Sequence, residues 1–221
     1  MLEVILIIAI LLFSVMIHEC AHGVVALWFG DDTAQRQGRL SLNIARHIDP
    51  VGTIVLPMVL LIFYLMTGSG IVFGWAKPVP VSVGNLRNPQ RDYTFVSLAG
   101  PLSNILLAFV FAFILLFSII FLKGHGIIFT VASVLCLFGV KINIILAMFN
   151  LIPIPPLDGS HVLAYLLPYP LSVRYRQFAR YGIVIIFFLI ITDTLKYPFL
   201  FTDYLSRILI GWMISIGRFF G

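Results

Sequence analysis

Two histidines and one glutamate lie close together in the first long apolar stretch of the chain, at His18, Glu19 and His22. Residues four positions apart lie on one face of an α-helix, so both imidazoles can bind a single Zn²⁺ ion. Glu19 follows the first imidazole and can take a proton from a water molecule at the metal without binding the metal itself. This spacing predicts a zinc hydrolase with Glu19 as general base. The alternative is a polar contact between helices in which the three side chains satisfy each other.

A zinc ion with two histidine ligands needs a third protein ligand and a position open to water. Asp158 is the strongest candidate, because it follows a stretch with three prolines at the end of a long apolar segment. Irregular backbone at this depth is tolerated only against protein or a water-filled cavity. Asp158 is equally well placed to cap the helix that begins after it, and the sequence leaves both interpretations open. Further candidates for the third ligand are Asp31, Asp32, Asp49, His47, His125 and His161.

The composition shows what kind of scaffold must position these side chains. Of 221 residues, 61% are apolar and only 10% are charged, and the net charge is +5. The mean hydropathy is +1.08. Soluble globular domains carry about 25% charged residues. This composition excludes a disordered chain, a nucleic-acid-binding domain and an ordinary soluble enzyme, and it predicts an integral membrane protein.

The fold class that we expect is an all-α polytopic membrane protein with five to six transmembrane helices. A bilayer core needs about 20 apolar residues in a helix. Five segments reach or approach that length, namely about Leu2–Phe29, Thr94–Leu122, Ile127–Phe149, Tyr181–Leu195 and Phe199–Phe220.

A short β-strand and a re-entrant element are expected between the first two core helices. Gly38–Ile44 alternates apolar and polar residues, as a half-buried strand does. Residues 51–75 either cross the membrane or enter and return on the same side. If they return, ten Lys and Arg residues lie inside and two lie outside, which fits the positive-inside rule. The chain then crosses five times, with its N-terminus outside and its C-terminus inside.

Three stretches of the sequence resemble the site-2 protease family of intramembrane zinc metalloproteases. They are His18–His22, Ala99–Asn104 and Phe149–Gly159, in the order that the family has them. The chain is most similar to a compact prokaryotic branch of that family without PDZ or CBS domains. The resemblance implies a membrane-embedded metalloprotease core over residues 1–167, followed by a C-terminal helix pair over residues 168–221.

The resemblance also implies roles for individual residues. It makes His18, His22 and Asp158 the ligands of one Zn²⁺ ion per chain, and it makes Glu19 the catalytic base. Asn150 matches a family position that engages the substrate backbone near the scissile bond, and Asn104 matches the polar position of the Gly-Pro helix as a further substrate-binding candidate.

The function implied is hydrolysis of peptide bonds within or near transmembrane helices of membrane protein substrates, that is, regulated intramembrane proteolysis. Its partners are those substrates and the lipid bilayer, with no nucleic acid, and a homo-oligomer is left open. The location implied is the plasma membrane of a prokaryote, with the active site toward the cytoplasmic side. A substrate helix must unwind before cleavage, and the strand near Arg39–Ile44 either pairs with it or merely shields the site.

Two other functions fit the same side chains less well. A non-proteolytic metal-binding or metal-transport protein would spread its ligands along a path across the bilayer. A membrane zincin that cleaves soluble substrates generally holds its site outside the bilayer, whereas the motif here lies within an apolar helix.

Overall fold

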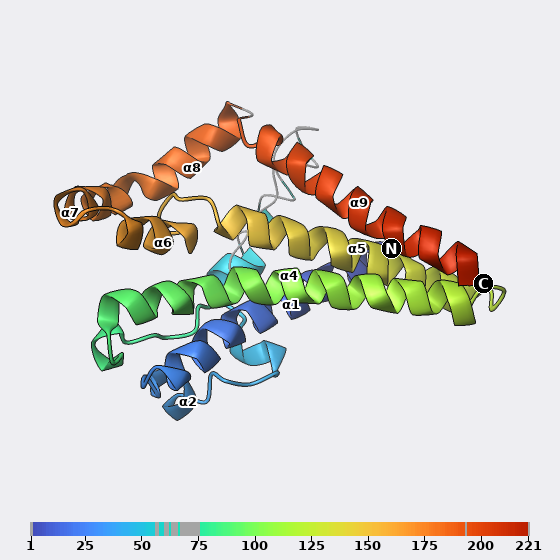
Figure 1. The fold of residues 1–221 in the computed structure, drawn as a ribbon, viewed down its shortest axis with the longest axis horizontal. Helices are drawn as coiled ribbons and strands as arrows, with labels where there is room; N and C mark the ends of the chain where they lie inside the picture. The colour runs from blue at the N-terminus through green and yellow to red at the C-terminus, as the bar shows by residue number, and fades with distance from the viewer. Residues whose placement is uncertain are drawn as a thin grey trace.

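Four long helices form the frame of the protein in a computed structural model that describes residues 2–55, 58, 59, 62, 66, 76–192 and 194–220. They are α1 (Leu2–Trp28), α4 (Pro89–Phe121), α5 (Ile127–Asn150) and α9 (Lys196–Phe220). Each is long and apolar enough to cross a membrane. They run alternately in opposite directions, so that both termini lie at the same end of the bundle (Figure 1).

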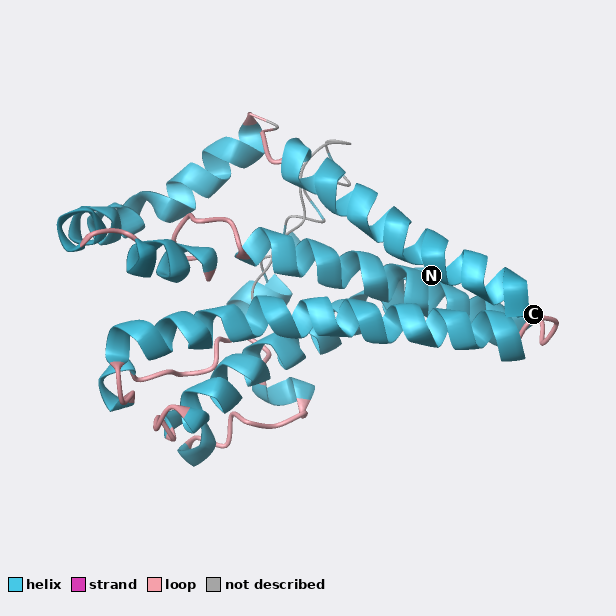
Figure 2. Cartoon of the chain, viewed as in Figure 1, coloured by secondary structure: helices cyan, strands magenta, loops and turns pink. Residues whose placement is uncertain are grey.

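Short helical elements and loops gather at the opposite end (Figure 2). In chain order they are α2 (Thr33–Arg36), η1 (Ile44–Arg46), η2 (Pro50–Val55), η3 (Val83–Asn85), α6 (Gly159–Leu166), α7 (Tyr169–Gln177), η4 (Phe178–Tyr181) and α8 (Gly182–Ile191). No strand occurs in the part of the chain that the structure describes. The all-α expectation is therefore confirmed for that part.

The outer faces of the long helices are apolar and exposed, as expected for helices that face lipid. Leu106 is 65% exposed and Phe113 is 60% exposed, both on α4. Water would penalise such a surface, whereas lipid tails solvate it. The protein is an integral membrane protein.

Helix α4 is the central element, and it packs against α1, α5, α9 and α6. Where α4, α5 and α9 meet, Ala112, Val140 and Met213 form a buried apolar cluster. Gly139 of α5 lies so close to the ring of Phe111 that a Cβ atom there would be 2.4 Å from it. Small residues that let helices approach closely are the usual basis of packing in membranes.

The fifth expected membrane helix, Tyr181–Leu195, is too short to be one. Helix α8 has 10 residues, which span about 15 Å of a hydrocarbon core of about 30 Å. It ends at Ile191, and the C-cap residue Thr192 donates both its backbone N–H and its hydroxyl to Phe188 O. Among the described residues four helices are long and apolar enough to cross a membrane, and they return the C-terminus to the end where the N-terminus lies (Figure 1).

The expected strand at Gly38–Ile44 does not form, because local polar side chains bind its backbone. Ser41 Oγ accepts from Asn43 N at 3.2 Å, and Asn43 Oδ1 accepts from Ala45 N at 3.0 Å. Such side-chain contacts compete with strand pairing and favour turns. Leu40 packs instead on α1 at Gly23, where a Cβ atom would lie 2.4 Å from Leu40 Cδ2.

The expected re-entrant element falls largely outside the described residues. Its first part is the π-helical turn η2. The proposed domain boundary at residue 167 stays a prediction, although α9 packs along α4 and α5.

The close approach at Gly139 predicts that Gly139→Ala lowers stability. The new methyl group must displace the Phe111 ring, and overpacking of this kind costs about 1–3 kcal/mol. Thermal unfolding in mild detergent measures the effect. Gly211→Ala is the matched control, since nothing lies within 4 Å of its Cβ position on α9. It should be neutral or stabilise by up to about 1 kcal/mol, and equal effects of the two changes would contradict the packing.

Candidate metal centre

The fold brings His18, His22 and Asp158 together from α1 and from the segment between α5 and α6. The Nε2 atoms of His18 and His22 are 3.1 Å apart. Asp158 Oδ2 lies 3.2 Å from His18 Nε2 and 3.5 Å from His22 Nε2. The three side chains are 8%, 12% and 18% exposed. The structure thus joins two residues of one helix turn to a third that is far away in the sequence.

Both imidazoles are held by their other ring nitrogen. His18 Nδ1 donates to Asn104 Oδ1 at 2.6 Å, and His22 Nδ1 donates to Val96 O at 2.7 Å. Both acceptors lie on α4. With the proton of each neutral ring on Nδ1, each Nε2 presents a lone pair to the centre of the cluster. This is the arrangement in which metal-binding histidines are normally held.

The orientation of the Asn104 amide is itself fixed by a buried polar network. Asn104 Nδ2 donates to Asn143 Oδ1 at 2.9 Å, so that its oxygen must face His18. Asn143 Nδ2 in turn donates to Ser14 Oγ and to Gly139 O. Asn104, Asn143 and Ser14 are fully buried. Buried polar groups persist in an apolar bundle only when they are satisfied in this way.

The geometry of the three facing atoms fits a divalent metal ion. Asp158 Oδ2 is buried, and no described residue satisfies it with a regular hydrogen bond. Three lone pairs therefore converge, and only a cation between them, a proton or a metal ion, offsets their repulsion. Ligands about 2.0–2.1 Å from a tetrahedral zinc ion lie about 3.3 Å from one another. The observed separations of 3.1, 3.2 and 3.5 Å match this spacing.

The carboxylate of Asp158 points to this cluster and does not cap α6. Asp158 occupies the position before Gly159, but its side chain makes no capping hydrogen bond. A carboxylate that binds a metal is deprotonated, so Asp158 would be an anionic ligand beside two neutral imidazoles. The structure therefore does not support the capping interpretation, and it places Asp158 where a third ligand would lie.

Gly100 allows α4 to lie directly against the imidazoles. A Cβ atom at Gly100 would be 2.5 Å from His22 Nε2 and 2.6 Å from His18 Nε2. Pro101 follows within the helix and removes the backbone donor that would bond to Ser97 O. No other residue leaves room for the two rings at this point.

Glu19 is held by a loop that covers α1. Val79 N donates to Glu19 Oε2 at 2.7 Å, which leaves the second carboxylate oxygen for another partner. Arg39 fixes this loop, because its Nη2 donates to Lys77 O at 2.8 Å and to Pro78 O at 3.1 Å. Arg39 is itself buried.

The remaining candidate side chains lie elsewhere. Asn150 ends α5, and its Nδ2 donates to Leu146 O at 3.0 Å, so it is not brought into the cluster by a described contact. The alternative third ligands have other contacts or positions: Asp31 accepts from Thr33, Ser82 and Asn85, Asp32 pairs with Arg36, Asp49 accepts from Val51 and Gly52, His47 lies beside Cys20, His161 contacts Tyr93, and His125 is exposed.

The cluster lies closer to one end of α4 than to the other. Helix α4 has 33 residues and is about 50 Å long, so it projects beyond a core of about 30 Å. From Gly100 to the end of α4 the helix covers about 31 Å. The end of the bundle with the short helices is therefore the end nearer the cluster.

Four positions that build the site were not among the predicted site residues, namely Ser14, Val96, Gly100 and Asn143, although Gly100 lies within the stretch Ala99–Asn104. Val96 and Ser14 gave no signal, because their roles arise from contacts between helices. Two signals were present. Gly100 precedes a proline within an apolar helix, and Asn143 is an amide in the middle of another, where unpaired polar groups are costly.

A helical membrane bundle around a buried His–His–Asp cluster, with a glutamate next to the first histidine, defines the class as an integral membrane metallohydrolase. The family model "Peptidase family M50" matches residues 119–191, which include Asp158. A protein of Bacillus subtilis (strain 168), YwhC, is 36% identical over 192 residues, which are 85% of this chain and 80% of YwhC. The chain belongs to peptidase family M50, and the resemblance to site-2 proteases is confirmed.

Two further relatives extend the comparison. Rip2 of Mycolicibacterium smegmatis is 28% identical over 87% of this chain and 69% of its own length. Rip2 of Mycobacterium tuberculosis is 32% identical over 70% of this chain and 54% of its own length. YwhC and both Rip2 proteins bear the provisional name of zinc metalloproteases. No solved structure matches the chain significantly.

The contact at Gly100 predicts that Gly100→Ala abolishes metal binding although every ligand is kept. The methyl group would occupy the space against both Nε2 atoms and push the rings apart. Metal analysis of the purified protein should show at least about tenfold weaker retention, as for changes that misorient ligands. Gly84→Ala is the control, because nothing lies within 4 Å of its Cβ position. Full metal content in Gly100→Ala would contradict the geometry.

Proposed function

We propose that the protein hydrolyses peptide bonds within or near transmembrane helices of membrane proteins, with one zinc ion held by His18, His22 and Asp158. As a member of peptidase family M50 the chain is an intramembrane zinc metalloprotease. The observation that carries the residue assignment is the convergence of two imidazole nitrogens and one carboxylate oxygen within 3.1–3.5 Å. Neutral nitrogen and anionic oxygen donors suit zinc.

Glu19 is the proposed catalytic base. The zinc ion supplies Lewis-acid activation of water and of the scissile carbonyl. The Glu19 carboxylate takes the proton from the attacking water and then delivers it to the leaving amine. The hydrogen bond from Val79 N to Glu19 Oε2 fixes the carboxylate and leaves Oε1 for this proton transfer.

The two asparagines receive different roles in this proposal. Asn104 is fully buried and accepts from His18, so we assign it to orienting that imidazole and not to contact with substrate. Asn150 is partly exposed at the end of α5, near the turn that carries Asp158. Its amide oxygen remains available to a substrate backbone N–H, which supports the substrate-binding role.

The distribution of charge supports a metal centre on the cytoplasmic side of a prokaryotic plasma membrane. Eight of the 14 Lys and Arg residues lie in the loops and short helices at the end of the bundle with the cluster, and Arg91 lies in the first turn of α4 at that end. Lys123 and Arg218 lie at the other end (Figure 1). Positive residues concentrate on the cytoplasmic side of membrane proteins. In this orientation both termini lie outside.

The base assignment predicts that Glu19→Gln loses cleavage and keeps zinc. The amide cannot take a proton from water, so the rate should fall by about 10²–10⁴-fold, whereas the ligands are unchanged. The measurement is cleavage of a panel of single-span membrane proteins by purified enzyme in proteoliposomes, with metal content determined in parallel.

Asp32→Asn is the matched control for Glu19→Gln, because Asp32 is 49% exposed and pairs with Arg36 at the surface. It should retain full activity, and a chelator should remove activity from both proteins. Cleavage by Glu19→Gln at the wild-type rate would contradict the role of Glu19. A zinc-loaded wild-type protein that cleaves none of the substrates would favour a metal-binding or transport function instead.

The orientation predicts which loops react from outside the cell. In a background without Cys20 and Cys136, a cysteine in place of exposed Lys123 should react with a membrane-impermeant maleimide on intact cells. A cysteine in place of exposed Arg174 should react only after the membrane is opened. The reverse pattern would place the metal centre on the outer side.

A further inference from the structure

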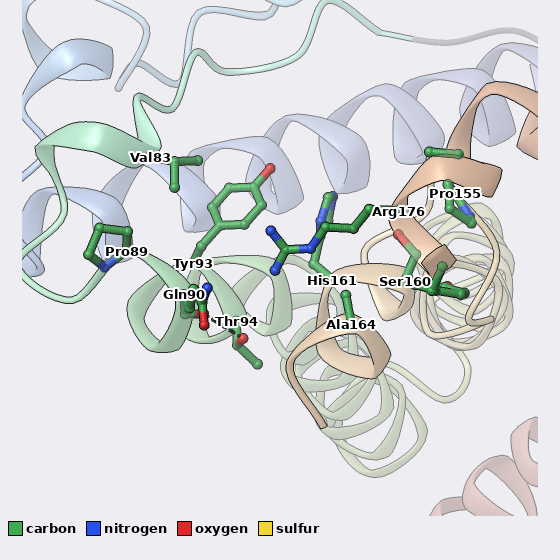
Figure 3. Close-up of a pocket in the computed structure, with 12 residues that line it drawn as sticks. Val83, Pro89, Gln90, Tyr93, Thr94, Pro155, Ser160, His161, Ala164 and Arg176 are labelled. Carbon is green, nitrogen blue, oxygen red and sulfur yellow. Dashed lines mark hydrogen bonds between the residues drawn. The ribbon is translucent and has the colours of Figure 1, made fainter. Parts of the chain in front are cut away.

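A cavity of about 320 Å³ lies between α4, α6 and α7 at the end of the bundle with the short helices. Figure 3 shows the side chains of Tyr93, His161 and Arg176 around it. Apolar residues such as Val83 and Ala164 form other parts of its wall. We refer to this space as the basic cavity, because a guanidinium and an imidazole line it and no carboxylate does.

Two segments of the chain contribute residues both to the basic cavity and to the metal centre. Ser160 and His161 line it and come directly after Asp158 at the start of α6. Tyr93 lines it from α4, one helical turn before Val96, whose carbonyl holds His22. The charge of Asp158 acts on both Tyr93 and His161. A polypeptide that passes the cluster can therefore place a neighbouring side chain in this cavity.

Arg176 is the one permanently charged residue among the described residues that line the basic cavity, and it is exposed. Arg176 forms no ion pair with a carboxylate of the described residues, and its charge acts on His161. The His161 ring contacts Tyr93 edge-on, with centroids 4.7 Å apart. Burial lowers the pKa of His161, so that this ring stays neutral and Arg176 supplies the permanent charge. The hydroxyl of Tyr175 donates to Pro153 O at 2.8 Å.

We propose that the basic cavity binds an acidic side chain of the substrate near the scissile bond, and that Arg176 determines this specificity. The inference rests on the proposed protease function. A pocket with apolar walls and a few polar groups is typical of a binding site. Its walls suit the methylene groups of a glutamate, and the guanidinium suits the carboxylate. The cavity shares Ser160 and His161 with the segment that follows Asp158, so a polypeptide bound at the cluster would lie beside it.

The test compares substrate twins that differ only in Glu or Gln at each of three positions on either side of the cleaved bond. Wild type should cleave one Glu substrate faster than its Gln twin. Arg176→Gln should reduce that preference by about five- to tenfold. Arg176→Glu should prefer a Lys substrate at the same position, which a general loss of stability would not produce.

Arg174→Gln is the control, because Arg174 is exposed on α7 but does not line the cavity. It should keep the wild-type preference. The same loss in Arg174→Gln would indicate surface charge or lipid headgroups and would overturn the inference, as would an unchanged Glu preference in Arg176→Gln. Cleavage of no substrate by wild type would instead overturn the proposed function, and this inference with it.

Discussion

The site is organised around three lone pairs that face each other inside a membrane bundle and repel one another. His18, His22 and Asp158 place their ligand atoms 3.1–3.5 Å apart, and in so dry a place this repulsion is screened weakly. A cation at the centre turns the repulsion into attraction. The polar side chains around the cluster are buried because they hold the three ligands in place, and this burial costs free energy.

Helix α4 holds both imidazoles in place, because one of its faces supplies a hydrogen-bond acceptor to each ring. Asn104 and Val96 accept from His18 and His22, and Gly100 between them leaves room for the rings. Asn143 on α5 then fixes Asn104. Each contact crosses from one helix to another, so the orientation of the metal ligands depends on the packing of α1, α4 and α5. Metal sites whose outer contacts are fixed in this way bind more tightly.

The parts of the fold that were predicted correctly are those with long local patterns. Four apolar segments became α1, α4, α5 and α9, because in lipid a helix satisfies its own backbone. The two elements that failed were short. Ile191 ends α8 after 10 residues, and Ser41 and Asn43 bind the backbone where a strand was expected. Short segments follow their neighbours and their own polar side chains more than their apolar pattern.

The sequence by itself determined that the chain is a membrane protein and that His18, Glu19 and His22 lie on one helix turn, because helix geometry is local. It also suggested Asp158 but left capping as an equal alternative. Only the tertiary structure placed its carboxylate beside His18 and His22, because α5 and the turn after it carry Asp158 back to α1. It also decided that Asn104 faces His18 and that four of the described helices are long enough to span a membrane, since such features depend on packing between segments distant in the sequence.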